Sequence, residues 1–149
     1  MHNPEAVAWA IAAEGCIGLR KNRNALSPIV SIANTSKIFM DKFVDMVDGV
    51  GNRYMYHANN PRHKSSYYWA LQSIGDCMDF LIEIYDYLPI KQEQTEIVIN
   101  YCIRALERIK STRHLHSGSI KWKATWKLTQ EDLDDYAKMR ELNKKGPSS

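Results

Sequence analysis

Glu14 lies where the sequence predicts the C-terminal end of the first helix, a place that is unfavourable for a carboxylate. Asn3 is a good N-cap, Pro4 suits the first helical position, and Gly15 favours a stop. The negative end of the helix dipole disfavours a carboxylate there by about 0.3–1 kcal/mol. A carboxylate kept at such a place is a candidate ligand for a hard cation that also contacts phosphate oxygens. An unpaired surface glutamate is the alternative.

The same helix is rich in alanine, and small side chains let two helix backbones approach closely. A face made of Ala6, Ala10 and Ala13 can therefore pack on another helix of this chain. It can equally pack on its own copy across a two-fold axis. The residues leave both possibilities open.

Basic residues gather in stretches that contain no carboxylate. The net charge is only +3, but residues 15–40, 49–75 and 108–130 hold 13 of the 20 Lys and Arg and none of the 17 Asp and Glu. A surface built from such stretches would be positive, which is typical of a polyanion binder. The alternative is that strands exclude Asp and Glu for conformational reasons.

Hydrophobic periodicity predicts an α+β fold with an antiparallel sheet. Two hairpins are expected, at 16–34 and at 52–73, the second with a polar tip at 59–65. In the second hairpin we expect Tyr54, Tyr56, Trp69 and Leu71 to be buried. Helices are expected over 4–14, from Thr35 or Ser36 to Gly49, over 76–88 and 91–109, and after Thr129. The chain divides into a core, 1–109, and a basic C-terminal extension, 110–149, which ends in a helix and a polar tail.

Length and composition exclude several classes of protein. The 149 residues fit one domain, and no apolar run reaches the ~20 residues that cross a bilayer. The first residues lack the basic region of a signal peptide. Cys16, Cys77 and Cys102 are an odd number without C-x-x-C spacing, which favours reduced thiols and argues against structural zinc. We therefore expect an intracellular protein, cytoplasmic in a prokaryote or within a DNA-containing organelle.

Residues 7–15, Val-Ala-Trp-Ala-Ile-Ala-Ala-Glu-Gly, resemble the nine-residue motif of the LAGLIDADG homing endonucleases. The next residues, Cys-Ile-Gly-Leu, resemble the strand that follows the motif, and the order of elements to residue 109 is similar to the family's α-β-β-α-β-β-α core. Residues 90–94 stand where the family has a lysine-bearing segment, and residues 128–146 look like the C-terminal segment of some members. The resemblance implies a single-motif, homodimeric, intron-encoded type with a four-stranded, saddle-shaped sheet that lies in the DNA major groove.

That resemblance also implies a reaction and residues for it. The reaction is Mg²⁺-dependent hydrolysis that breaks both strands of a long, pseudo-palindromic DNA site; Mn²⁺ can replace Mg²⁺, and Ca²⁺ can bind without supporting cleavage. Glu14 is the implied metal-binding carboxylate, with Ala13 next to it as a second metal contact. Lys91 is implied to stabilise charge and Asn34 to position solvent. The motif helices of two copies would meet through Ala6, Ala10 and Ala13. Double-stranded DNA and a second copy are the partners, with no membrane and no small-molecule substrate.

We expect the uncovered face of the sheet to read bases and the basic segments to contact phosphates. The expected DNA-binding residues are Arg20, Asn22, Asn24, Ser31, Arg53, His57, Tyr68 and Gln72 on the sheet, Arg62 and Lys64 on the hairpin tip, and Lys121 and Lys123 in the extension. Gly18, Ile29, Met55 and Ala70 are expected on the same face and offer no side-chain hydrogen bond.

Trp9 and Ala12 depart from the motif, because Trp9 occupies a small position and Ala12 replaces an aspartate. Both departures bear on the packing of the helix rather than on the metal-binding position. A non-cleaving nucleic-acid-binding protein of the same fold, either an RNA-splicing maturase or a transcription regulator, is the alternative function. A structural interaction protein is a third possibility, which the basic, carboxylate-free strands disfavour.

Overall fold

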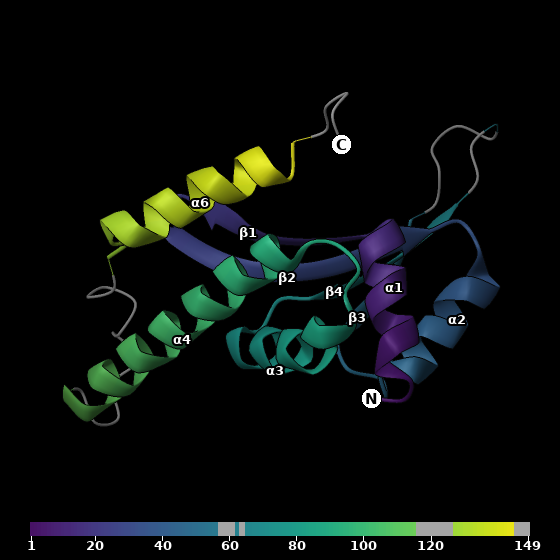
Figure 1. The fold of residues 1–149 in the computed structure, drawn as a ribbon, viewed down its shortest axis with the longest axis horizontal. Helices are drawn as coiled ribbons and strands as arrows, with labels where there is room; N and C mark the ends of the chain where they lie inside the picture. Colours follow the sequence, from purple (N-terminus) through teal and green to yellow (C-terminus); the bar gives the residue numbers. More distant parts are fainter. Residues whose placement is uncertain (57–61, 63–64, 116–126, 145–149) are drawn as a thin grey trace.

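The computed structural model describes residues 1–56, 62, 65–115 and 127–144 and has a mixed α+β fold (Figure 1). The elements follow in the order α1 (Pro4–Glu14), β1 (Gly15–Asn22), β2 (Ala25–Asn34), α2 (Lys37–Met46), β3 (Asn52–Tyr56), β4 (Ser66–Leu71), α3 (Ile74–Ile84), the 3₁₀ turn η1 (Tyr85–Tyr87), α4 (Gln92–Leu115) and α6 (Gln130–Leu142). The predicted α+β class is confirmed. None of the helices within these ranges is long and apolar enough to cross a membrane.

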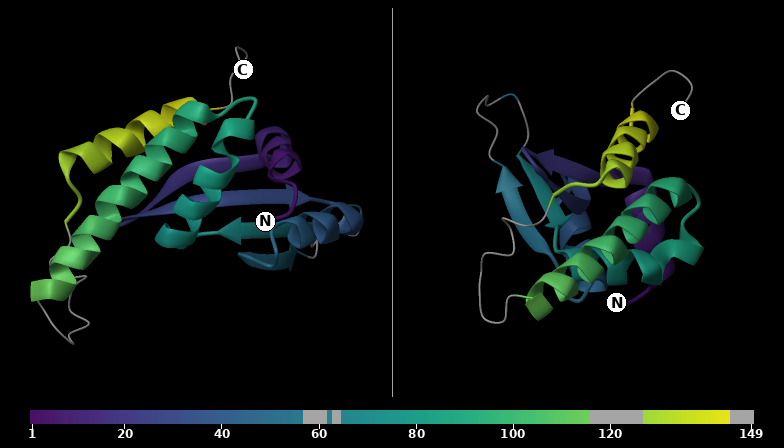
Figure 2. Two further views of the ribbon diagram at one scale, coloured as in Figure 1. Left: turned by 60° about the horizontal axis from the view of Figure 1, so that its bottom comes forward. Right: turned by 90° about the vertical axis from the view of Figure 1, so that its left-hand side faces the viewer.

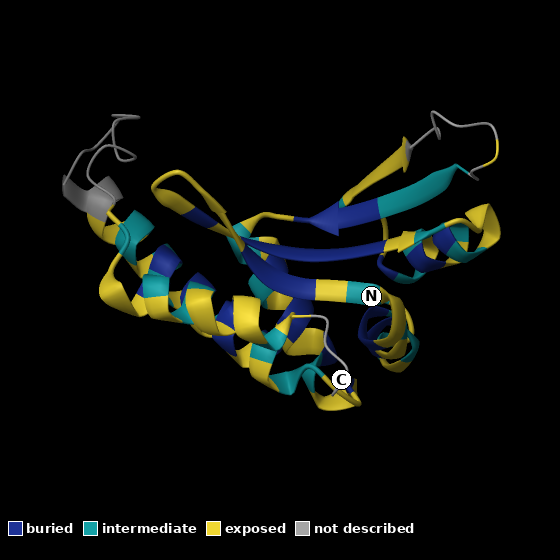
Figure 3. Cartoon of the chain, turned by 90° about the horizontal axis from the view of Figure 1, so that it is seen from above, coloured by how far each residue is buried: buried dark blue, intermediate teal, exposed yellow. Residues whose placement is uncertain are grey.

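The strands form one antiparallel sheet in the order β1-β2-β4-β3, with β1 and β3 at its edges. Helices α1 to α4 pack against one face of this sheet, as two further views show (Figures 2 and 3). Alternate strand residues from that helix-covered face join the helices in one core, among them Ile17, Val30, Ile32, Trp69 and Leu71. The other face, called the open face below, carries Cys16, Gly18, Arg20 and Asn22 of β1, Ser27, Ile29, Ser31 and Ala33 of β2, Asn52 and Tyr54 of β3, and Tyr68 and Ala70 of β4.

Side-chain caps fix where the helices begin. Asn3 accepts a hydrogen bond from the Ala6 amide, and Ser36, rather than Thr35, accepts one from the Phe39 amide. Thr129 caps α6, as predicted from the sequence. Each cap satisfies one of the amides that a helix start leaves without a backbone partner. Local sequence therefore sets these boundaries.

Trp69 anchors the second hairpin to the core. Its indole Nε1 donates to the Val50 carbonyl at 2.8 Å, and its ring meets the ring of Phe43 edge-on at 4.9 Å. Gly51 lies against the indole with a φ of +85°, and a Cβ there would come within 2.6 Å of Nε1. Only glycine fits this approach, because it tolerates positive φ and has no side chain. The start of β3 is thus set by its contact with Trp69.

The structure corrects the expected faces of β3. Arg53 pairs in register with Trp69 and lies on the helix-covered side, where its guanidinium contacts the Asp41 carboxylate of α2 at 2.6 Å. Tyr54 lies on the open face, with its ring 6.2 Å from that of Tyr68. The prediction that Tyr54 is buried and Arg53 open was wrong by one residue, and such a shift moves every side chain of a strand to the other face. Met55, also expected on the open face, lies on the same side as Arg53.

Two residues expected on the strands lie outside them, and one helix extends beyond its expected end. Asn24 belongs to the turn between β1 and β2, next to Arg23 at a φ of +56°, and Gln72 follows the end of β4. Helix α4 continues through residue 110 to Leu115, past the expected end of the core. His57, Lys64, Lys121 and Lys123 lie outside the described residues.

Candidate active site and nucleic-acid interface

Glu14 is the last residue of α1, and its exposed side chain lies where the helix joins β1. Gly15 makes that junction possible. A Cβ on Gly15 would lie 2.8 Å from both the Ile11 and the Ser31 carbonyl oxygens. The missing side chain lets the chain pass directly from helix to strand. Glu14 is therefore held at a fixed point on the rim of the sheet, with Ala13 exposed beside it.

Lys91 reaches the same point from the segment before α4. Its ammonium Nζ donates to the carbonyl oxygen of Gly15 at 2.7 Å and to that of Ile11 at 3.3 Å. The charge of Lys91 thus lies at the negative end of α1, where a cation is favoured. Partial burial lowers the pKa of Lys91 below its usual value, against a smaller opposing effect from the nearby Cys16. The two residues with the strongest expected roles, Glu14 and Lys91, are brought to one place.

The backbone that carries Lys91 has an unusual conformation, which sequence analysis did not predict. Lys91 has a φ of +72°, a conformation that a non-glycine residue adopts only when its surroundings require it. Thr95, whose side chain is fully buried, donates its hydroxyl to the Lys91 carbonyl at 2.7 Å. Gln92 also donates its amide to the Leu88 carbonyl. These contacts hold the turn that aims Lys91 at the end of α1.

Asn34 ends β2 on the same rim of the sheet. It lies two residues beyond Ile32, which pairs with Gly15. Its Oδ1 accepts a hydrogen bond from the Ser36 amide at 2.8 Å, in the turn that leads into α2. One lone pair of that oxygen is therefore used in the turn, and its second lone pair and the NH₂ group of Asn34 are left to contact solvent.

One chain supplies only part of a divalent-cation site. Within the residues that the structure describes, no three His, Cys, Asp or Glu side chains come together as a metal-binding group. Glu14 offers a hard, exposed carboxylate, the ligand type that Mg²⁺ prefers, and Mg²⁺ usually keeps waters and substrate phosphates as its other ligands. The donors fit such a cation if a second carboxylate comes from another copy of the chain.

The open face of the sheet is spanned by a contact between distant residues. The Arg20 guanidinium of β1 donates to the Tyr68 hydroxyl of β4 at 3.2 Å. The side chains that lie between these two residues on the open face are almost inaccessible to solvent: Ile29 is 4% exposed, Ser31 8% and Ala70 2%. Asn22 at the end of β1 is exposed, as are Gln72 and Arg62. Of the sheet residues expected to read DNA, Ser31 is thus covered in this structure, and Arg20 and Tyr68 form one bridged pair.

The outer side of α1 is only partly covered by the described residues. Val7, Ala8, Ile11 and Ala12 are buried in the core. Ala6 and Ala10 are half-buried, Ala13 is exposed, and Trp9 is 56% exposed. Intrachain packing therefore explains Ala8 and Ala12, and Ala10 packs partly against the core, whereas the outward row of Ala6, Trp9, Ala10 and Ala13 keeps exposed surface.

Comparison by sequence finds no matching family model and no matching curated protein. Comparison by fold finds solved homing endonucleases. An archaeal intron-encoded homing endonuclease complexed with DNA matches with a TM-score of 0.64 and 16% identity, over 96% of this chain and 85% of its own. The homing endonuclease I-CvuI, in complex with its target in the presence of Ca, matches with 0.57 and 11%, over 93% of this chain and 92% of its own.

A longer protein matches as well. The LAGLIDADG homing endonuclease I-GzeII, in complex with a DNA target, has a TM-score of 0.57 and 19% identity, and the match covers 93% of this chain and 45% of that protein. This chain therefore spans about half of I-GzeII but nearly all of I-CvuI. The element order, the sheet and these likenesses agree that this chain has the fold of the LAGLIDADG homing endonucleases.

Proposed function

We propose that two copies of this chain form a site-specific DNA endonuclease that makes a double-strand break in a long, pseudo-palindromic duplex. The observation that carries the proposal is the meeting of Glu14 and Lys91 at the junction of α1 and β1. Lys91 donates to two carbonyl oxygens that flank Glu14 in the chain. A carboxylate that can hold a divalent cation and an ammonium that can stabilise negative charge both favour phosphodiester hydrolysis at this rim of the sheet.

Each of these residues would have a separate role in the proposed hydrolysis. A divalent cation, Mg²⁺ or Mn²⁺, would supply Lewis-acid activation of the phosphate and of water. Glu14 would hold the cation, with Ala13 contributing its carbonyl. Lys91 would place positive charge next to the developing negative charge of the transition state. Asn34 would orient water through its amide group.

Dimerisation follows from the shortage of ligands in one chain. Glu14 is a single carboxylate, and a second copy of the chain would supply a second one for the proposed cations. The outward row of α1 offers the surface: Ala6, Ala10 and Ala13 allow close approach, and Trp9 is a large apolar side chain exposed to solvent. Pairing through this row would bring two copies of Glu14 to the two-fold axis. Trp9 would then lie at the periphery of the helix contact rather than in its centre.

The open face of the sheet is the proposed DNA surface. Residues 15–34, which form β1 and β2, contain no Asp or Glu. Arg20 and Asn22 carry the donors and acceptors that recognise guanine and adenine in the major groove. The neighbours I-CvuI and I-GzeII were both solved with DNA, which supports the assignment to a DNA-binding surface.

The test uses the host gene, which is the gene that contains the intron proposed to encode this protein. That intron is the intervening sequence. The protein is incubated with Mg²⁺ and the host gene, once with and once without that sequence. A homing endonuclease gives discrete cleavage of the uninterrupted allele only. Binding without cleavage of either allele would replace the proposal with the non-cleaving alternative, and no binding at all would contradict both.

A further inference from the structure

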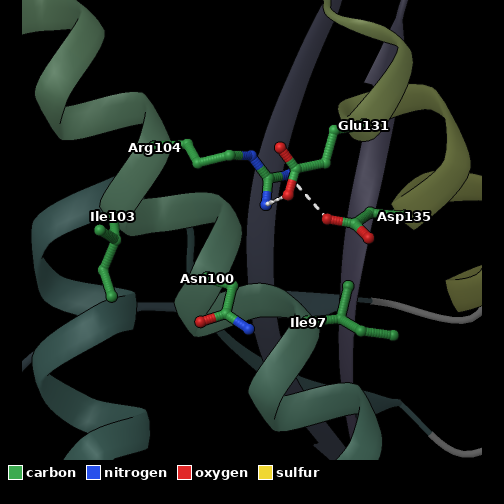
Figure 4. Close-up of a pocket in the computed structure, with 6 residues that line it drawn as sticks. All are labelled: Ile97, Asn100, Ile103, Arg104, Glu131 and Asp135. Carbon is green, nitrogen blue, oxygen red and sulfur yellow. Dashed lines mark hydrogen bonds and ion pairs between the residues drawn. The ribbon is translucent and has the colours of Figure 1, made fainter.

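Helix α6 is fixed to α4 by a cluster of charged side chains (Figure 4). Asp132, fully buried, accepts hydrogen bonds from Arg104 at 3.1 Å and Arg108 at 2.9 Å, and Asp135 accepts one from Arg104 at 2.7 Å. Burial alone would raise the pKa of Asp132, but hydrogen bonds from Arg108, the Thr129 backbone and Arg104 outweigh it and hold the pKa at about 2. The N-terminal half of α6 is thus tied down by charge-assisted bonds.

The C-terminal half of α6 lies along the free edge of β1. Met139 is buried in the shared core. Asn143, the C-cap of α6, donates its Nδ2 to the Ile17 carbonyl at 3.0 Å, and its Oδ1 accepts from Gln94 of α4 at 3.5 Å. An edge strand leaves such carbonyls unpaired, and here the helix end covers one of them. The end of α6 is therefore held at a defined residue of β1.

That residue adjoins Gly18, a buried position of the open face against which Met139 and Asn143 of the α6 end lie. The row of β1 on that face runs Cys16, Gly18, Arg20, Asn22, and only Gly18 lacks a side chain. A Cβ built on Gly18 would lie 3.2 Å from Asn143 Nδ2. The exposed amide of Asn143 thus borders the place that a side chain of residue 18 would occupy. The sequence indicated a position without hydrogen-bonding ability there, and α6 brings an amide to it.

We propose that Asn143 is a specificity-determining residue that reads an adenine in the major groove. The inference rests on the proposed function and deepens it. The Nδ2 group has two hydrogens, of which one is used by the Ile17 carbonyl. Oδ1 keeps one lone pair beside the one that accepts from Gln94. The second hydrogen and this lone pair would contact adenine N7 and N6, respectively.

The geometry also sets where the adenine lies. Gly18 follows Glu14 by four residues, which is ~13 Å along a strand. That length corresponds to about four base steps of 3.4 Å from the cleaved phosphate. In a symmetric dimer the preference appears once in each half-site.

The test is a selection from a pool of randomised DNA duplexes, bound in Ca²⁺ so that cleavage is not required. The wild-type chain is compared with Asn143→Ala, with Asn143→Asp and with Gln130→Ala, an exposed position at the other end of α6. We expect the wild type to select adenine at one position of each half-site. Asn143→Ala should reduce that preference by at least about fivefold and leave the other positions unchanged. Asn143→Asp, which accepts but does not donate, should shift it toward cytosine, and Gln130→Ala should match the wild type.

Two results would overturn this inference and leave the proposed function intact. One is an unchanged base preference in both Asn143 variants. The other is an even loss of affinity across all sequences together with a lower melting temperature, because that pattern belongs to a residue that only covers the edge of β1. If the wild type itself binds no duplex, or binds all duplexes equally, the proposed function fails and this inference with it.

Discussion

The Nζ atom of Lys91 lies 2.7 Å from the carbonyl oxygen of Gly15, the residue that follows Glu14. Two segments that are far apart in the sequence therefore meet at the end of α1. The ammonium offsets the negative end of the helix dipole, which otherwise opposes a carboxylate there. The proposed function uses both groups at this helix end, Glu14 for the cation and Lys91 for the transition-state charge.

Replacing Lys91 with Met should lower the cleavage rate by about 10²-fold or more, the usual cost of removing a group that stabilises transition-state charge. Burial lowers the pKa of Lys91, so its charge is present below that lowered pKa and is lost as the pH rises through it. As the pH rises, wild-type cleavage should therefore begin to decline before pH 10.5, which is the pKa of an ordinary lysine. The rate–pH profile measures this, and an alkaline limb that is identical in Lys91→Met would contradict the assignment.

Replacing Gly15 with Ala should destabilise the fold by about 1–3 kcal/mol, because the new Cβ meets two backbone oxygens that cannot easily move. Urea unfolding measures the change. Gly75→Ala is the matched control, since a Cβ at Gly75 has no heavy atom within 4 Å. Equal stability of the two variants would show that the junction of α1 and β1 is looser than described.

Replacing Asp132 with Asn should cost about 3–5 kcal/mol, because it leaves Arg104 and Arg108 without their buried counter-charge. The pKa of Asp132 is lowered from 3.8 to about 2, so its contribution is complete above pH 3.8 and is lost as the pH falls toward 2. Acid unfolding of the wild type should show this loss, and that of Asp132→Asn should not. Asp134→Asn is the control, because Asp134 is exposed and contacts only Gln130 among the hydrogen bonds described here. A control that is as destabilised as Asp132→Asn would refute the role of the cluster.

Replacing Trp9 with Arg should weaken the proposed dimer and shift it toward monomer, with little change in the stability of the single chain, because Trp9 is more than half exposed there. Sedimentation equilibrium measures the mass. Ile38→Arg, at a 70% exposed position on α2, should remain dimeric. If Trp9→Arg stays dimeric while Ile38→Arg dissociates, the two-fold contact is not on α1.

Local sequence was sufficient for most of the fold. Asn3, Pro4 and Gly15 define α1 through their own backbone preferences, and alternation of apolar residues defines β1 and β2. The expected capping by Thr129 is also local. Such features depend on residues within a few positions of one another, so they can be predicted from the sequence without a structure.

Contacts between distant segments were not predictable. Arg53 and Tyr54 each combine a polar end with an apolar body, so the sequence alone did not decide which faces the core, and Asp41 of α2 decides it. Asp132 fits the common pattern of an acid in the first turn of a helix, whereas its buried contacts with Arg104 come from 28 residues away. The positive φ of Lys91 and the approach of Asn143 to Gly18 likewise depend on tertiary packing.

The proposed endonuclease activity depends on Glu14, and DNA cleavage by Glu14→Gln in Mg²⁺ tests this dependence. Glu5→Gln, at the exposed start of the same helix, is the matched control. We expect Glu14→Gln to bind the same DNA as the wild type and to leave both strands intact, while Glu5→Gln cleaves normally. Undiminished cleavage by Glu14→Gln would show that Glu14 does not hold the cation that cleavage needs.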